Sequence, residues 1–265
     1  SESNMSKVHS LSIFFMGVAA FAGFLIPIVL FIYFRKNKKT DISPFFVGCF
    51  IFIFFSMILE TSVHKVVLGS AIDANIKNNI VLYAIYGGAM AAVFEECGRL
   101  FAFKVMLKKR MDKDINALMY GAGHGGFEAA AILGFTMISN LTLAAMVNGG
   151  KMESVLGNLS GDALSQLQTS ITTLATTPSY IFLLGIAERI STVVIQISLS
   201  VLVWFSVKDK KSLFFAALLI HFVVDAITVI MTGTHIPVVI VEAVLAAVAA
   251  AAALFARNIY RKEEN

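Results

Sequence analysis

Residues 80–103 read IVLYAIYGGAMAAVFEECGRLFAF, an apolar stretch in which only Glu95, Glu96 and Arg99 are charged. A helix needs about 20 predominantly apolar residues to cross the hydrocarbon core of a bilayer. The stretch meets that length, and a helix satisfies its own backbone polar groups where no water is present. We therefore predict a transmembrane helix that carries three charges.

The rest of the chain has the same apolar character. Of its 265 residues, 58% are hydrophobic and 14% are charged, whereas soluble domains usually carry about 25% charged residues. Six further apolar runs are long enough to span a bilayer: 11–34, 44–68, 115–147, 178–207, 212–231 and 236–256. We expect an all-α polytopic membrane protein, a bundle of about seven transmembrane helices that forms one domain over residues 1–265.

Three smaller features complete the outline of the chain. Residues 1–4, ahead of Met5, are expected to be a cloning remnant. The polar segment 148–177 is rich in Ser, Thr and Gly, and we expect an extracytoplasmic loop with a short amphipathic helix. Cys49 and Cys97 both lie in apolar runs, so we expect two buried structural thiols and no disulfide framework.

The lysines and arginines are distributed unevenly between the two sets of loops. One set, which includes the C-terminal tail, holds 15 of the 21, and the opposite set holds four. Because basic loops stay in the cytoplasm, this bias predicts an outside N-terminus and a cytoplasmic C-terminus. The net charge of +4 is then a signal of topology, which argues against nucleic-acid binding. The pattern suits a bacterial plasma membrane.

Several ionisable residues lie deep inside the predicted spans. Each costs at least about 2.5–3.5 kcal/mol at the bilayer centre, so the chain must pair them and has a use for them. Glu96 lies eight residues before a basic cytoplasmic loop, and His124 and His221 each lie ten residues after such a loop. At about 1.5 Å per residue, all three are about 12–15 Å from the cytoplasmic boundary. This shared depth predicts a site near the bilayer midplane.

The spacing of these residues along each helix supports one shared site. Three pairs lie four residues apart: Glu95 with Arg99, His124 with Glu128, and His221 with Asp225. Residues at this spacing lie on one helix face. Such a pair can supply two ligands to one metal, or the carboxylate can orient the imidazole through its second nitrogen. Arg99 also follows Glu96 by three residues, so it can pair with either glutamate.

Other residues in the spans are less strongly predicted to belong to this site. Glu188 and Arg189 are expected nearer the outer side, where a structural ion pair and a direct role are equally favoured. Glu60 and His64 are expected near the outer boundary, in satisfied surface or interface positions. The glycines that surround His124 favour close helix packing over space for a substrate strand: Gly121, Gly123, Gly125 and Gly126.

Three motifs, each on its own predicted helix, carry a family resemblance: Glu95-Glu96-Cys97-Gly98-Arg99, His124-Gly125-Gly126-Phe127-Glu128 and His221-Phe222-Val223-Val224-Asp225. They resemble the YhfC-type intramembrane metalloproteases of bacteria. In layout they are similar to type II CAAX proteases, to bacteriocin-processing proteases and to PrsW-like proteases. The interval from the glutamate pair to Arg99 is one residue shorter than in CAAX proteases, and Glu128 follows the middle histidine. Both differences favour the YhfC branch over prenylated-protein processing.

The resemblance implies a membrane-embedded peptidase with a substrate that is embedded in or anchored to the bilayer. In the first hypothesis, His124, Glu128 and His221 hold a zinc ion, and Glu96 or Glu95 acts as general base. Arg99 then orients the glutamate pair, and Asp225 orients His221. In a metal-free alternative, a glutamate and His124 activate water directly, while His221 with Asp225 stabilises the oxyanion.

Two other classes of function fit the same residues. Intramembrane Glu, His and Arg also build proton relays, so a proton-coupled or metal-coupled transporter is the first alternative, although the sequence shows no internal repeat of the kind common in transporters. A non-catalytic receptor or immunity protein on a protease-like bundle is the second. The sequence leaves the substrate and the oligomeric state open.

Overall fold

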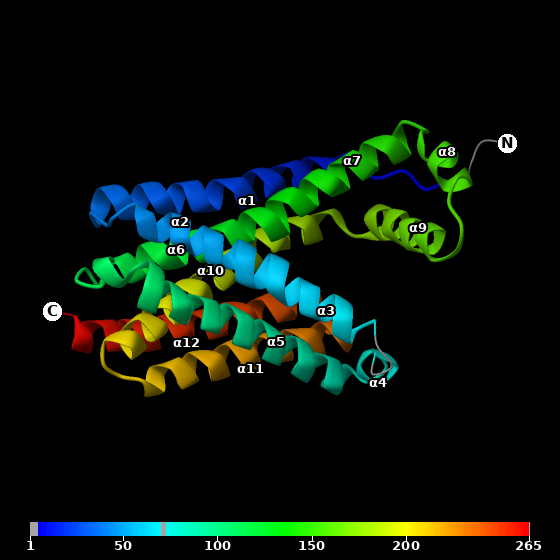
Figure 1. Cartoon of the computed structure of the whole chain (residues 1–265). Helices are drawn as coiled ribbons and strands as arrows, with labels where there is room; N and C mark the ends of the chain where they lie inside the picture. Colours follow the sequence, from blue (N-terminus) through cyan, green and yellow to red (C-terminus); the bar gives the residue numbers. More distant parts are fainter. Residues whose placement is uncertain (1–4, 70–72, 265) are drawn as a thin grey trace. The chain divides into compact units, whose positions relative to one another are not determined.

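The computed structural model describes residues 5–69 and 73–264, and within them the chain is helical, with short connections and no strand (Figure 1). The expected cloning remnant, residues 1–4, lies outside the described residues. Seven helical segments are long and apolar enough to cross a membrane. The all-α, multi-span prediction is therefore confirmed.

The seven spans begin and end close to the predicted positions. Three of them combine α-helix with a stretch of the wider π-helix. The spans are α1 (Ser10–Asn37), α2-η1-α3 (Ser43–Ile51, Phe52–Glu60, Thr61–Val67), α5-η2 (Ile80–Phe101, Ala102–Met106), α6-η4-α7 (Asn116–Ala129, Ala130–Phe135, Thr136–Asn148), α10 (Ser179–Lys208), α11 (Ser212–Gly233) and α12 (Val238–Glu263).

Four short helices connect the spans: α4 (Asp73–Lys77), η3 (Lys108–Arg110), α8 (Met152–Gly157) and α9 (Gly161–Thr176). The predicted loop 148–177 therefore holds two helices instead of one. In α9, Ile171 and Leu174 are buried while most other positions are exposed, so this helix is amphipathic as expected.

Local sequence explains where several helices begin. The Asn79 side chain accepts hydrogen bonds from the backbone N–H groups of Val81 and Leu82, at 3.0 and 3.2 Å, and so caps α5. Pro44 occupies the first turn of α2, where its missing N–H costs nothing. Pro237 is the N-cap residue of α12, directly before its first turn.

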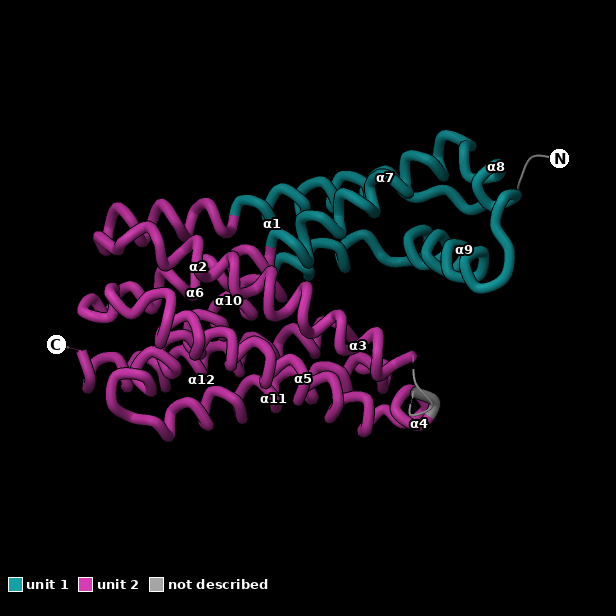
Figure 2. The backbone as a smooth tube through the Cα atoms, viewed as in Figure 1, with its two compact units in different colours: residues 1–25, 130–187 teal, residues 26–129, 188–265 magenta. Residues whose placement is uncertain are grey.

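The chain groups into two compact units, shown in different colours in Figure 2. Unit 1 comprises residues 1–25 and 130–187, and unit 2 comprises residues 26–129 and 188–265. Unit 1 packs around Met16, Ala144 and Ile171. The side chain of Asn148 ties its N-terminal segment down, since it both donates to and accepts from the backbone of Val8 at 2.9 Å.

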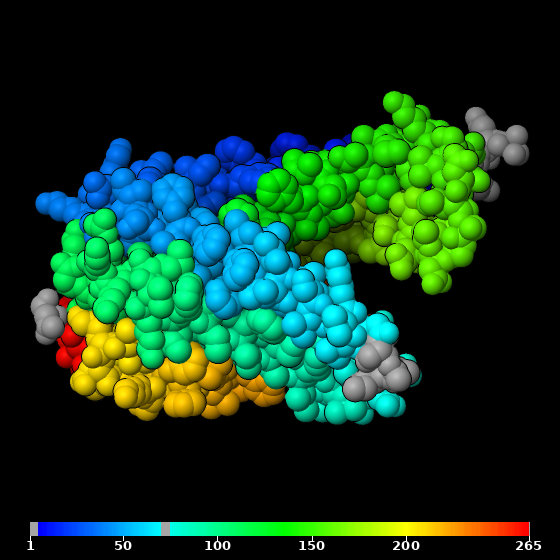
Figure 3. All heavy atoms as spheres, in the orientation of Figure 1, coloured from blue at the N-terminus to red at the C-terminus, as the bar shows by residue number. Residues whose placement is uncertain are grey.

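Unit 2 has the larger core, and α10 supplies more of its buried residues than any other helix. Of the most apolar window of α10, 72% is buried, against 22–28% for the other six spans. Trp204 is fully buried, and its indole N–H donates to Asp114 Oδ1 at 2.9 Å. Elsewhere in unit 2, α5 and α11 pack directly against each other, as the space-filling view shows (Figure 3). These packed helices carry the polar residues described next.

Helices α2 and α6 pack with their backbones in contact. A Cβ atom added to Gly123 would overlap the carbonyl oxygen of Phe45, and one added to Gly48 would lie 2.7 Å from the amide nitrogen of His124. The other three glycines of the cluster also face neighbouring atoms of unit 2: Gly121 meets Ile197, Gly125 meets Gln196 and Gly126 meets Pro27. The packing interpretation of these glycines is confirmed, and none of them leaves space for a substrate.

Candidate active site in unit 2

Helix α5 turns Glu95, Glu96 and Arg99 into the interior of unit 2. All three are buried, and Glu96 and Arg99 are wholly inaccessible. Cys97, which lies between them in sequence, is exposed on the opposite face of the helix. The prediction that Cys97 is a buried thiol is therefore wrong, because the helical turn that buries the glutamates places residue 97 outside. Cys49 is half-buried, which corrects the second thiol prediction as well.

Arg99 is fully coordinated by hydrogen bonds. Its Nε and Nη2 donate to the two carboxylate oxygens of Glu96 at 3.0 and 3.1 Å, which is a bidentate ion pair. The remaining N–H groups donate to the Gln196 carbonyl at 2.9 Å, to the Ser200 hydroxyl and to the Gln196 side-chain oxygen. All five guanidinium donors are used, so Arg99 holds Glu96 in one orientation and joins α5 to α10.

Glu95 lies between the two predicted histidines. Its Oε1 is 3.0 Å from Nε2 of His124, and its Oε2 is 3.4 Å from Nε2 of His221. His221 is also held by Nδ1, 2.6 Å from Glu96 Oε1, and its Nε2 is 3.3 Å from Asp225. The neighbouring glutamates thus serve different purposes: Glu96 fixes the orientation of His221, and Glu95 faces both imidazoles.

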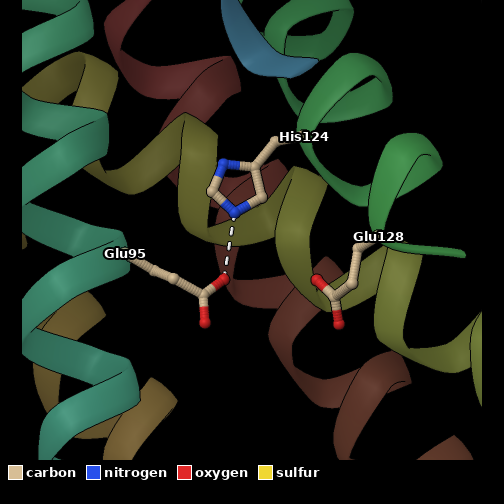
Figure 4. Close-up of side chains that lie close together, drawn as sticks. All are labelled: Glu95, His124 and Glu128. Carbon is tan, nitrogen blue, oxygen red and sulfur yellow. Dashed lines mark hydrogen bonds and ion pairs between the residues drawn. The ribbon is translucent and has the colours of Figure 1, made fainter. Parts of the chain in front are cut away.

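Glu95, His124 and Glu128 form a buried trio with one ligand atom each, all within 4.8 Å of one another. Figure 4 shows Glu95 from α5 pointing toward the two side chains of α6. Imidazole nitrogen and carboxylate oxygen are zinc ligands, and three protein ligands with an open position are typical of catalytic zinc. The chemistry and spacing of this trio fit such an ion.

The second ring nitrogen of His124 is also engaged. Nδ1 lies 3.1 Å from the Tyr120 hydroxyl, one helical turn earlier on α6. When Nδ1 carries the proton and donates it to the Tyr120 oxygen, the lone pair of Nε2 is directed toward the trio. An outer partner of this kind fixes the tautomer and the ring orientation of a metal-binding histidine.

Gln196 connects the parts of the site. Its amide nitrogen donates to Glu95 Oε1 at 3.1 Å and to Glu128 Oε2 at 2.7 Å, while its oxygen accepts from Arg99. Arg189 donates to the other oxygen of Glu128 at 3.2 Å. Each carboxylate of the trio therefore has a donor that holds it in place, and these donors come from α10.

The structure brings all seven predicted site residues into one network, although their grouping differs from the prediction. The metal trio was predicted as His124, Glu128 and His221. Among the described residues, the trio with ligand atoms within 4.8 Å contains Glu95 in place of His221. His221 contacts the other carboxylate oxygen of Glu95, so the predicted and observed trios differ in one member.

Arg189 and Glu60 lie differently from the prediction. Arg189 reaches Glu128 and joins the network, although it was expected nearer the outer side; its neighbour Glu188 accepts from Arg189 at 3.0 Å and is partly exposed. Glu60 is buried and not at the surface. It accepts from Ser56 at 3.2 Å and lies 3.3 Å from His64, its neighbours one helical turn before and after.

Sequence reasoning missed Gln196, Ser200 and Tyr120. A neutral polar side chain in an apolar run gives a weak signal, because it costs far less in a membrane than a charge does. The isolated amide of Gln196 between Ile195 and Ile197 was the one usable clue.

One cavity gives the site an open side. It has a volume of about 360 Å³ and is lined by His64, Tyr83, Tyr86 and Asp225 among others. Asp225 contacts His221 and lines the cavity, so the cavity ends at the polar network. Its remaining walls include Leu68, Gly87 and Val229 and are mainly apolar.

Comparison with known proteins places these residues in a family. A sequence model described as "YhfC intramembrane metalloprotease" matches residues 22–246. The chain is 36% identical over 216 residues to a protein of Bacillus subtilis (strain 168) described as "Uncharacterized membrane protein YhfC". That alignment covers 81% of this chain and 83% of the relative. No solved structure matches.

Proposed function

The chain belongs to the YhfC intramembrane metalloprotease family, and from this premise we propose that it hydrolyses a peptide bond of a membrane-embedded or membrane-anchored substrate. The observation that carries the proposal is the buried trio Glu95, His124 and Glu128 beside a separately oriented His221. Peptide hydrolysis needs an activated water, a stabilised oxyanion and a proton donor for the leaving amine. The site has candidates for each.

In this proposal, Glu95, His124 and Glu128 hold a zinc ion. Bound there, the metal would make a water more acidic and polarise the scissile carbonyl. Gln196 and Arg189 keep the carboxylates of the trio in place. Tyr120 holds the His124 ring. The family description supports a metal in general, and the choice of zinc rests on the ligand types.

His221 is the proposed proton carrier. Glu96 accepts from its Nδ1, and Arg99 prevents Glu96 from moving. Its Nε2 is directed to the side where Glu95 and Asp225 lie. A histidine held in this way can take a proton from water and deliver it to the leaving amine, which is worth about 10²–10⁴-fold in rate. His221 thus takes the general-base role that was predicted for Glu96 or Glu95.

The cavity that ends at Asp225 is the proposed entry for water and for the substrate segment. Its apolar and aromatic walls fit an unwound stretch of an apolar peptide, and Asp225 brings a polar group to the point where the backbone must meet the site. A membrane-derived peptide suits these walls better than a charged soluble one.

The test is metal content and cleavage measured on the same preparations. We expect stoichiometric zinc and cleavage of membrane-anchored peptides by the purified protein in liposomes. Glu95→Gln and His124→Ala should lose both, whereas Glu188→Gln, a partly exposed neighbour, should keep both. Full cleavage after thorough chelation would support the metal-free mechanism. Ion flux without substrate, combined with no cleavage across a broad peptide panel, would refute the peptidase and support a transporter.

A further inference from the structure

A second cavity in unit 2 lies apart from the polar network. Its volume is about 480 Å³, within the range of about 300–1,000 Å³ typical of small-molecule sites. Its walls come from α6, α10 and α12, with Lys38 just beyond the end of α1. None of the proposed catalytic residues lines it.

Helix α12 gives this cavity a wall that changes from apolar at one end to cationic at the other. The lining residues of α12 recur at three- and four-residue intervals, so they form one face: Ala253, Ala256, Arg257, Tyr260 and Arg261. Glu264, just beyond the end of the helix, also lines the cavity. The small alanines lie at the inner end of this row and the arginines at the outer end. From Ala253 to Arg261 the helix advances about 12 Å. Helix α10 lines the cavity with Val194, Ile197 and Val201, so the inner walls are mainly apolar.

Three cations line the cavity without an ion-pair partner. Lys38, Arg257 and Arg261 are exposed, and none forms an ion pair with any side chain that the structure describes. Some other cations at the same predicted side of the membrane are paired, such as Lys113 with Asp41, Lys208 with Asp114, and Lys210 with Glu263. Others, such as Lys108 and Lys109, are exposed and have no ion-pair partner among the described residues, but they do not line the cavity. The single carboxylate in the wall, Glu264, leaves an excess of positive charge. The cavity thus combines an apolar floor with an uncompensated cationic rim.

We propose that this cavity binds one anionic phospholipid. Lys38, Arg257 and Arg261 bind the headgroup phosphate, and an acyl chain lies along Ala253, Ile197 and Val194. Arginine is suited to phosphate because its planar donors bind two oxygens at once. Basic pockets between transmembrane helices on the cytoplasmic side are typical sites for anionic lipid headgroups. The inference does not depend on peptidase activity.

The experiment measures lipid retention by the full-length protein. The purified protein is incubated with mixed micelles that contain phosphatidylglycerol or phosphatidylcholine, and bound lipid is counted by native mass spectrometry. We expect one tightly retained phosphatidylglycerol per chain and no retained phosphatidylcholine. The double variant Arg257→Gln/Arg261→Gln should weaken phosphatidylglycerol binding roughly thirtyfold, since each surface cation contributes about a fivefold effect.

Two controls separate this site from general basic attraction. Lys108→Gln/Lys109→Gln removes two exposed cations from the same predicted side but outside the cavity, and should leave retention unchanged. Ala253→Phe fills the apolar end, keeps every charge and should weaken retention as the double arginine variant does. It decides the question if the arginine variant does not fold. Equal retention by all variants, an equal loss in the Lys108/Lys109 control, or displacement of the lipid by inorganic phosphate alone would overturn the proposal.

Discussion

Arg99 shows what a charge needs inside a membrane protein. Every one of its donors has an acceptor, and three of the acceptors belong to α10. Removing one member of a buried ion pair strands the other, which costs about 3–5 kcal/mol. Arg99→Met should therefore lower the free energy of unfolding by about that amount, measured by denaturant titration in detergent. Arg110→Met is the matched control, because Arg110 is exposed and its loss should cost less than about 1 kcal/mol. Equal effects would contradict the assigned role of Arg99.

His221 can be tested separately from the metal trio. Because it lies outside the trio, His221→Asn should lower the cleavage rate by about 10²–10⁴-fold and leave the zinc content unchanged. Rate and metal content are measured on one preparation. Loss of zinc in this variant would return His221 to the ligand set that the sequence predicted.

The sequence identified the charged residues of the site and could not assign their roles. The cost of burying Glu96, His124 and His221 and their equal depth were visible in the order of residues alone. Whether Glu95 or His221 joins the trio depends on side-chain directions across three helices. The spacing of residues along one helix does not predict these directions. Gln196 was missed for a related reason, since its importance arises only from what faces it.

At the scale of helices, α2 and α6 depend on glycine. Gly123→Ala should destabilise the protein by about 1–3 kcal/mol, because the added methyl group overlaps the Phe45 carbonyl and the backbones must separate. Gly17→Ala in α1 is the control: nothing lies within 4 Å of the added atom, and alanine should stabilise that helix by up to about 1 kcal/mol. Thermal unfolding in one detergent measures both. A neutral Gly123→Ala would refute the close contact.

The loop between α1 and α2 is expected to respond to acid. The pKa of Asp41 is held below its usual range. The hydrogen bond from the Asn116 amide has the largest effect, burial opposes it, and the charges of Lys113 and Arg110 lower the pKa further. A lowered folded pKa stabilises the fold above the unfolded value of about 3.9 and loses this effect as the pH falls through the folded value. The melting temperature of the wild type should therefore exceed that of Asp41→Asn at pH 7, and the difference should shrink below about pH 4. A difference independent of pH would argue against this carboxylate.

The limits of the spans could be predicted more fully than their internal geometry. Length and hydropathy placed all seven, since the thickness of the bilayer sets the length of a helix. The π-helical turns of η1, η2 and η4 could not be predicted, because they depend on how the backbone relaxes against neighbouring helices. Glu60, which is buried, is the last residue of η1.

For the whole molecule, the orientation in the membrane remains a prediction from the basic loops. A C-terminal fluorescent-protein fusion should be bright in bacterial cells and a C-terminal alkaline-phosphatase fusion should be inactive, because the C-terminus is expected in the cytoplasm. A reporter in the segment 148–177 should give the reverse result. Matching signals from both positions would refute the proposed topology. The expectation of a single domain also stays a prediction, since helical contacts group the residues into two units.

The exposed thiol of Cys97 makes the depth of the site measurable. It is adjacent to Glu96 in sequence, and the second cysteine, Cys49, is half-buried with its Sγ donating to the Gly123 carbonyl at 3.4 Å. A nitroxide attached to the native chain should therefore report mainly from position 97. Oxygen concentrates in the acyl region of the bilayer, whereas a nickel chelate stays in water. The ratio of the nitroxide relaxation caused by oxygen to that caused by the chelate would give the depth of the label in a liposome. The equal depth inferred from counting residues would then become a distance from the lipid phosphates.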